Sequence, residues 1–133
     1  MGCEVSASCG TEIETGNTLP ILHEIQHALQ RLIKEGETTT IDLRAIPLAP
    51  GEEQRLETLL GQGEVKAQVD ALGETTIQEC GVAGVWLITH FNSEEEILGK
   101  FIEVTSMPSI LESQHEDIRE GVEQLSRLLN QAQ

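Results

Sequence analysis

The feature that most restricts the fold of this chain is a run of four strand-like segments with only short connections between them. Residues 65–71 alternate between apolar and polar side chains, and residues 75–80 form a weaker segment of the same kind. VWLITHF (85–91) and ILGKFIEV (97–104) give the strongest strand signals. Parallel strands need a crossover of a dozen or more residues, whereas antiparallel strands can follow a tight turn. The sequence therefore predicts a mostly antiparallel sheet.

A helix and a further strand are expected before this run. Thr18 is the predicted N-cap, Pro20 falls in the first turn, and Gly36 is suited to end the helix. Residues 38–43 then alternate in the manner of a strand. The apolar side chains expected on the buried side of this helix are Leu22, Ile25, Leu29, Leu32 and Ile33.

Two more helices complete the pattern. One is expected to begin at Pro50 and end at Gly61, and the other to begin with a capping box made by Ser113 and Glu116. Their expected buried edges are Leu56, Leu59 and Leu60 in the first, and Ile118, Val122, Leu125 and Leu129 in the second. The order α-β-α-β-β-β-β-α predicts an α+β fold, in which a mostly antiparallel five-stranded sheet packs with about three helices.

The length of 133 residues suits one domain with one core. We expect residues 1–17 to form a flexible polar tail and residues 18–133 to form the domain. Residues 1–6 fit the minimal myristoylation pattern, with Cys3 as a palmitoylation candidate, but an anionic membrane would repel the acidic residues nearby. With no long apolar run and no signal-peptide pattern, we expect no membrane association and a cytoplasmic location.

The composition of the chain restricts the kinds of molecule that it can bind. A net charge of −15 repels phosphate, and an aromatic content of 2% leaves few rings on which bases could stack, so a nucleic-acid partner is not expected. The same charge either attracts a basic partner or only keeps the chain soluble. Cys3, Cys9 and Cys80 are an odd number of cysteines without metal-type spacing, which indicates a reducing compartment and no cofactor.

The sharpest enzymatic signal is HEIQH (23–27), which matches HExxH, the pattern in which two helical histidines bind zinc and the glutamate acts as base. At 100° per residue, His23 and His27 lie opposite the apolar side of the first helix. Gln30 and Ile33 occupy the places where a third histidine would follow in metzincins. We therefore expect solvated surface histidines, with a zinc-dependent hydrolase as the alternative function.

Several segments, taken in their order and spacing, resemble the C-terminal conserved region of the HupH/HyaF family of hydrogenase expression/formation proteins. The resemblance covers residues 19–129 approximately. The segments are EIQHAL (24–29), TTIDLRAIPL (39–48), GQGEV (61–65), GVW (84–86), HFN (90–92) and IEVTSMPSILESQHEDI (102–118).

This resemblance implies a bacterial cytoplasmic accessory protein for the maturation of uptake [NiFe]-hydrogenase. It implies as partners a hydrogenase subunit precursor and other maturation proteins. Family members are thought to chaperone the precursor of the small subunit, an iron–sulfur protein with a twin-arginine signal. Compared with longer members of the family, we expect this chain to lack their additional N-terminal region. The expected function is therefore protein binding and not catalysis.

Five residues are candidates for partner binding. Trp86 shares one side of its strand with His90, and tryptophan is enriched at binding hot spots, although a core position is the alternative. His90 either pairs with Glu103 on the adjoining strand or is an ordinary strand histidine. Gly63 and Glu64 fall in a segment that carries the family resemblance, and alternatively they only shape a turn.

Overall fold

The computed structural model describes residues 16–133 and confirms the predicted α+β fold, with the elements in the predicted order. Two short 3₁₀ helices, η1 (Leu43–Ala45) and η2 (Ser109–Leu111), are additional. The helices are α2 (Thr18–Glu35), α3 (Glu52–Leu60) and α4 (His115–Ala132), and the strands are β1 (Thr39–Asp42), β2 (Lys66–Asp70), β3 (Glu74–Glu79), β4 (Val85–Phe91) and β5 (Ile97–Val104).

The five strands form one antiparallel sheet in the order β1-β5-β4-β3-β2. Strands β2 to β5 are consecutive hairpins, as their short connections predict, and β1 pairs with β5 at the far edge. Between β4 and β5, Leu87 lies opposite Ile102, and Trp86 lies opposite Glu103. Because successive side chains on a strand point to opposite faces, this register gives the sheet two distinct surfaces.

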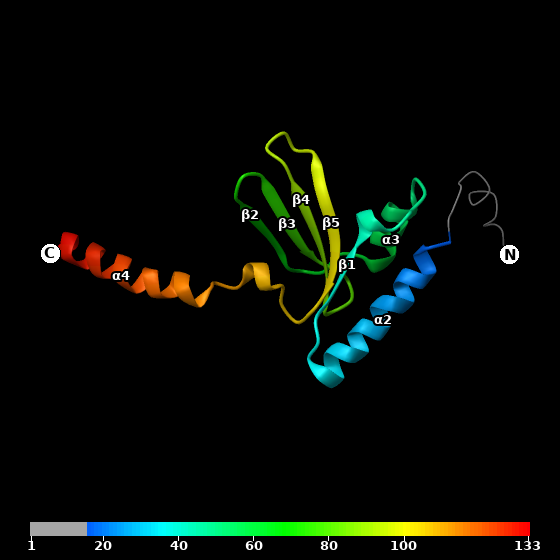
Figure 1. Ribbon diagram of the computed structural model, residues 1–133, viewed down its shortest axis with the longest axis horizontal. Coiled ribbons are helices and arrows are strands. Elements are labelled where there is room, and N and C mark those ends of the chain that lie inside the picture. Colours follow the sequence, from blue (N-terminus) through cyan, green and yellow to red (C-terminus); the bar gives the residue numbers. More distant parts are fainter. Residues whose placement is uncertain (1–15) are drawn as a thin grey trace.

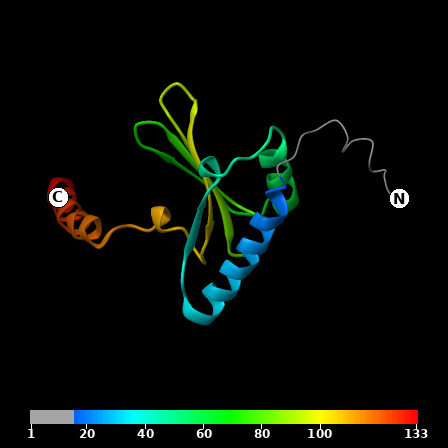
Figure 2. The ribbon, with the colours of Figure 1, turned by 45° about the vertical axis from the view of Figure 1, so that its right-hand side comes forward.

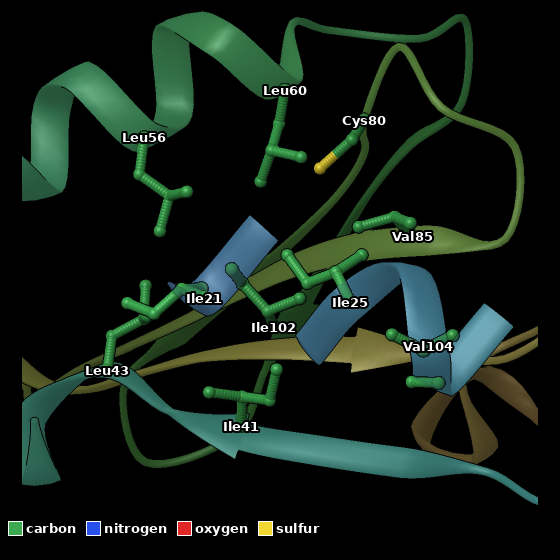
Figure 3. Close-up of a cluster of buried hydrophobic side chains, with 11 residues drawn as sticks. Ile21, Ile25, Ile41, Leu43, Leu56, Leu60, Cys80, Val85, Ile102 and Val104 are labelled. Carbon is green, nitrogen blue, oxygen red and sulfur yellow. The ribbon is translucent and has the colours of Figure 1, made fainter. Parts of the chain in front are cut away.

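Helices α2 and α3 cover the first face of the sheet, which carries Val85, Leu87, Ile102 and Val104 (Figures 1 and 2). Side chains from both helices, from β1 and from η1 converge there into the main core (Figure 3). Its members are almost entirely aliphatic, as the scarcity of aromatic residues requires. They are Ile21, Ile25, Ala28, Ile41, Leu43, Leu56, Leu60, Cys80, Val85, Ile102 and Val104.

The second face of the sheet has a smaller core of its own. Ile77, Trp86 and Ile88 are buried there, with Leu111 of η2 packed against them. Among the described residues no α-helix lies on this face, and the segment that follows β5 covers only part of it (Figures 1 and 2). The sheet therefore has one fully covered face and one partly covered face.

The structure corrects two predictions for α2. Asn17, and not Thr18, is the N-cap residue, and the Asn17 side chain donates a hydrogen bond to the Pro47 carbonyl oxygen at 2.9 Å. Thr18 is the first helical residue and is turned into the core. Ile33 is 84% exposed, because the buried side of α2 follows Ile21, Ile25 and Ala28. Gly36 ends the helix as predicted, with a left-handed φ of 70° that favours glycine.

The other helices depart from expectation in smaller ways. In α3, Leu56 and Leu60 are buried but Leu59 is exposed. In α4, Gln114 is the N-cap residue and makes no side-chain capping bond, so the predicted capping box of Ser113 and Glu116 is wrong. No residue of α4 is buried in the described chain, and the helix extends away from the sheet (Figure 1). The sequence predicts that the apolar side of this helix is buried, and the structure shows it exposed.

Lys100 of β5 ties α3 to the sheet. Its ammonium lies 2.8 Å from a Glu53 carboxylate oxygen and 2.7 Å from one of Glu57. Burial alone would lower the pKa of Lys100, but the hydrogen bonds and charges of the two glutamates outweigh it and raise the pKa. The stabilisation is therefore present at neutral pH and is lost only as the pH rises through the raised pKa.

Several predictions concern residues 1–15, which lie outside the described part of the chain. They are most of the expected polar tail (1–17), the myristoylation pattern, Cys3 and Cys9. Within residues 16–133, none of the helices combines the length and apolar character that a bilayer span requires.

Two isoleucines of α2 test the position of its buried side. We expect Ile25→Ala to lower the free energy of unfolding by about 2–4 kcal/mol, because it leaves a cavity in the main core. Ile33→Ala, the matched control, should change it by less than about 0.5 kcal/mol. Urea denaturation followed by circular dichroism measures both. Equal losses in the two variants would contradict the observed orientation of α2.

Candidate functional site

A hollow of about 250 Å³ opens on the second face of the sheet. Its floor comes from alternate residues of β1, β4 and β5, and its wall comes from η2. Apolar side chains make up one part of the lining, and polar side chains the other. The lining residues are Thr40, Ile88, His90, Phe101, Glu103, Ser109 and Ile110.

A second hollow of about 430 Å³ adjoins the first, because Glu103 and Ser109 line both. Its lining is mostly polar and includes Thr38, Thr105 and a second carboxylate, Glu112. Together the two hollows, which we call the groove, have an apolar end near Phe101 and an acidic end near Glu103.

His90 is fixed at the apolar end of the groove. Its Nδ1 lies 2.8 Å from the Thr75 hydroxyl oxygen, so the two groups share a hydrogen bond across β3 and β4. The imidazole also meets the Phe101 ring edge-on, with centroids 5.6 Å apart and planes at 69°. These two contacts hold the ring in place while it lines the hollow.

Glu103 sits where the two hollows meet. Burial raises the pKa of its carboxyl group, and the hydrogen bond from the Thr40 side chain opposes that shift only in part. The charged form of Glu103 therefore carries a solvation cost, which a cation placed in the groove would reduce.

Of the two alternatives for His90, the pairing with Glu103 does not occur. The register places His90 opposite Gly99, which is four residues from Glu103 along β5. At about 3.3 Å per residue, four residues separate the two positions by roughly 13 Å. Phe101 lies between them on the same face. His90 instead fits the alternative, a strand histidine with a local hydroxyl partner.

Trp86 lies beneath the surface. Its side chain is 5% exposed, it packs with Ile77 and Ile88, and its Nε1 donates a hydrogen bond to the Thr105 carbonyl oxygen at 3.0 Å. This bond fastens the segment after β5, which carries the wall of the hollow, to the sheet. The position matches the alternative of a core residue, and direct contact of Trp86 with a partner stays a prediction.

Gly63 and Glu64 are held against the end of β3. The Gly63 amide donates to the Glu79 carbonyl oxygen at 2.7 Å, and the Glu79 carboxylate accepts from the amides of Glu64 and Val65 at 3.2 and 3.3 Å. Glu79 is the register partner of Trp86, which is in turn the partner of Glu103. Two strand spacings, about 10 Å, therefore separate Glu79 from the acidic end of the groove.

The two histidines of HEIQH, His23 and His27, are exposed on α2, on the other side of the molecule from the groove. Within residues 16–133, no cluster of three or more His, Cys, Asp or Glu side chains is arranged to hold a metal ion. The geometry offers the zinc-hydrolase alternative no support.

Cys80 is buried beside α3 in the main core. Burial raises the pKa of its thiol to about 11, with added contributions from the charges of Glu57 and Glu79. The thiol therefore stays protonated at neutral pH, and only the thiolate is strongly nucleophilic. Cys80 behaves as a small apolar core residue.

Thr40, Phe101 and Ile110 are among the residues of the groove that sequence reasoning missed. Phe101 could have been found, because strand alternation places it on the same face as Glu103. Ile110 gave no signal, since its position depends on how the chain folds back after β5.

Comparison with known proteins gives a consistent result. A family model described as HupH hydrogenase expression protein, C-terminal conserved region, matches residues 15–132. The solved structure of the hydrogenase expression protein HupH from Thiobacillus denitrificans is similar, with a TM-score of 0.81 and 37% identity. The similarity covers 90% of this chain and 98% of that one.

Curated relatives extend the match. A hydrogenase expression/formation protein HoxQ of Azotobacter vinelandii is 27% identical over 114 residues, which are 84% of this chain and 40% of the relative. The hydrogenase-1 operon protein HyaF of Escherichia coli is 23% identical over 115 residues, which are 84% and 39%. This chain thus corresponds to about two fifths of the length of these relatives.

The contact at Gly63 can be tested by adding one methyl group. A Cβ on Gly63 would lie 2.6 Å from both the Cys80 carbonyl oxygen and a Glu79 carboxylate oxygen. We expect Gly63→Ala to lower the free energy of unfolding by about 1–3 kcal/mol, because backbone must move to relieve the overlap. The exposed neighbour offers a control, Gln62→Ala, which should be nearly neutral in the same urea titration. A neutral Gly63→Ala would show that the loop is not held as described.

Proposed function

Because this chain belongs to the HupH hydrogenase expression protein family, we propose that it acts in hydrogenase maturation by binding the precursor of a hydrogenase subunit. The names of the relatives support the maturation role. Among hydrogenases, the uptake [NiFe] enzymes are the proposed target, and the small subunit is the proposed partner. The proposed location is the cytoplasm, and residues 18–133 are proposed to form one domain.

The observation that carries this proposal is the groove on the second face. It is open, it combines an apolar end at Ile88, Phe101 and Ile110 with an acidic end at Glu103 and Glu112, and its floor is a rigid sheet. Such a surface suits an extended peptide segment that carries both apolar and basic side chains. A precursor with a twin-arginine signal has both.

The charge of the chain supports the same kind of partner. At a net charge of −15, the chain attracts basic segments over distances of about a Debye length, roughly 8 Å at physiological salt. This attraction raises the rate of encounter, whereas the apolar end of the groove slows dissociation. Glu64 and Glu79 extend the acidic surface toward β2.

We propose that this role is binding without catalysis. Cys80 is protonated and buried, and the His23 and His27 rings are exposed far from the groove. In the groove, His90 has a hydroxyl partner in Thr75, and within residues 16–133 no carboxylate contacts it to orient it as a general base.

The groove can be tested with a matched pair of histidine substitutions. We expect His90→Ala to weaken binding of a purified hydrogenase small-subunit precursor about tenfold or more, because it removes a fixed ring from the apolar end. His27→Ala removes the same side chain from exposed α2 and should leave the dissociation constant within about twofold. Calorimetry or surface plasmon resonance measures both, and circular dichroism checks that each variant is folded.

Glu103→Gln tests how much the negative charge contributes to binding at the acidic end of the groove. It preserves size but removes the carboxylate, so binding should weaken and lose part of its salt dependence. Glu35→Gln on exposed α2 is the control. If all four variants bind the precursor as the unchanged chain does, the groove is not the binding surface. Absence of binding by the unchanged chain would overturn the proposed partner.

A further inference from the structure

Helix α4 is strongly two-sided although it contacts nothing in the described chain. At 100° per residue, one arc of about 160°, which we call the uncharged arc, contains no charged residue. All six charged residues lie outside this arc, and they are Glu116, Asp117, Arg119, Glu120, Glu123 and Arg127. The large apolar side chains in the uncharged arc are Ile118, Val122, Leu125, Leu128 and Leu129, and each is between 52% and 64% exposed.

The width of this arc indicates the kind of surface that α4 meets. A coiled-coil seam uses a narrow stripe, whereas a helix that packs on a sheet or a core presents a stripe wider than about 100°. The uncharged arc therefore fits a broad surface better than a second helix.

In the described chain, the second face of the sheet is a broad surface that no α-helix covers. The second face of the sheet holds Ile88 and Phe101, with Ile110 exposed beside them. Helices α2 and α3 lie on the opposite face, and the segment after β5 carries α4 outward on the side of the second face (Figures 1 and 2). Each copy thus exposes an apolar helix side and an apolar sheet face, and within the described chain the two surfaces do not pack on each other.

We propose that two copies of this chain form a symmetric dimer, in which α4 of each copy packs across the second face of the other. The uncharged arc of α4 then meets the apolar end of the groove, while its charged side remains in water. Each copy gives one helix and receives one, so the contact is closed and does not propagate into a filament.

The area involved is that of a stable dimer. An 18-residue helix is about 27 Å long and, with its side chains, about 10–12 Å wide, so laid on a sheet it covers roughly 300 Å² on each partner. Two such contacts remove about 1,200 Å² in all, which is the lower end of the range for standard specific interfaces. Pairing of the two α4 helices alone would remove about half of that and would leave both sheets uncovered.

The net charge of −15 on each copy opposes association, which gives the dimer a characteristic salt response. Between about 0.01 M and about 1 M salt the Debye length falls from about 30 Å to about 3 Å, so repulsion between the copies is screened. The dimer should therefore tighten as salt rises. The dimer needs no precursor, but α4 of the partner copy would cover the groove, and on the proposed function a precursor would have to displace it.

The test measures mass in solution by light scattering on the complete chain at about 100 μM. We expect a mass twice the 14.6 kDa of one copy for the unchanged chain. Leu125→Glu, in the uncharged arc, and Ile110→Glu, on the receiving face, should each give monomers. Gln124→Glu introduces the same charge on the other side of α4 and should leave the dimer intact.

Mixing the two monomeric variants then tests the reciprocal geometry. A mixed pair keeps one intact contact, the unchanged helix of the Ile110→Glu copy on the unchanged sheet of the Leu125→Glu copy, so a weak dimer should reappear. A monomeric unchanged chain overturns the proposal. So does a dimer that survives Ile110→Glu, which would indicate helix pairing, or one that weakens as salt rises. All these measurements omit the precursor, so they are independent of the proposed function.

Discussion

The structure depends on the fact that the two central strands, β4 and β5, carry large side chains on both of their faces. Val85, Leu87 and Ile102 point one way, and Trp86 and Ile88 point the other. An antiparallel sheet commonly leaves one face in water, but a sheet that is apolar on both sides needs two covers. Helices α2 and α3 supply the first cover, and η2 supplies only part of the second. The open remainder is the groove.

Much of the fold could be predicted because its signals are local. The segments 85–91 and 97–104 have the bounds predicted for them, since alternation, turns and β-branched residues agree there. Predictions failed where tertiary contacts decide. Asn17 replaces Thr18 as the N-cap residue of α2, and Ile33 lies outside the buried side that Ile21, Ile25 and Ala28 define. Periodicity also does not show what an apolar stripe packs against. Helix α4 has an apolar stripe of the kind that core helices have, yet in the described chain it packs on nothing.

The candidate site was predictable in part for the same reason. Strand alternation places Trp86 and His90 on one face, and the structure bears this out. It does not give the offset between neighbouring strands, which decides between the two alternatives for His90: the register leaves Glu103 four residues away and favours the ordinary strand histidine. Ser109 and Ile110 reach the groove through a turn after β5 that no sequence pattern specifies. Family resemblance likewise identified Gly63 and Glu64 without revealing that Glu79 holds them.

The bond between Trp86 and the Thr105 carbonyl has a practical consequence. Trp86 is the single tryptophan of the chain, it lies directly under the second face, and tyrosine is absent, so all tryptophan fluorescence of the protein comes from this one indole. Its hydrogen-bond acceptor belongs to the segment that leads toward α4. Any event that shifts this segment or occupies the groove alters the surroundings of a unique chromophore. The molecule therefore contains its own optical sensor, which requires no attached dye.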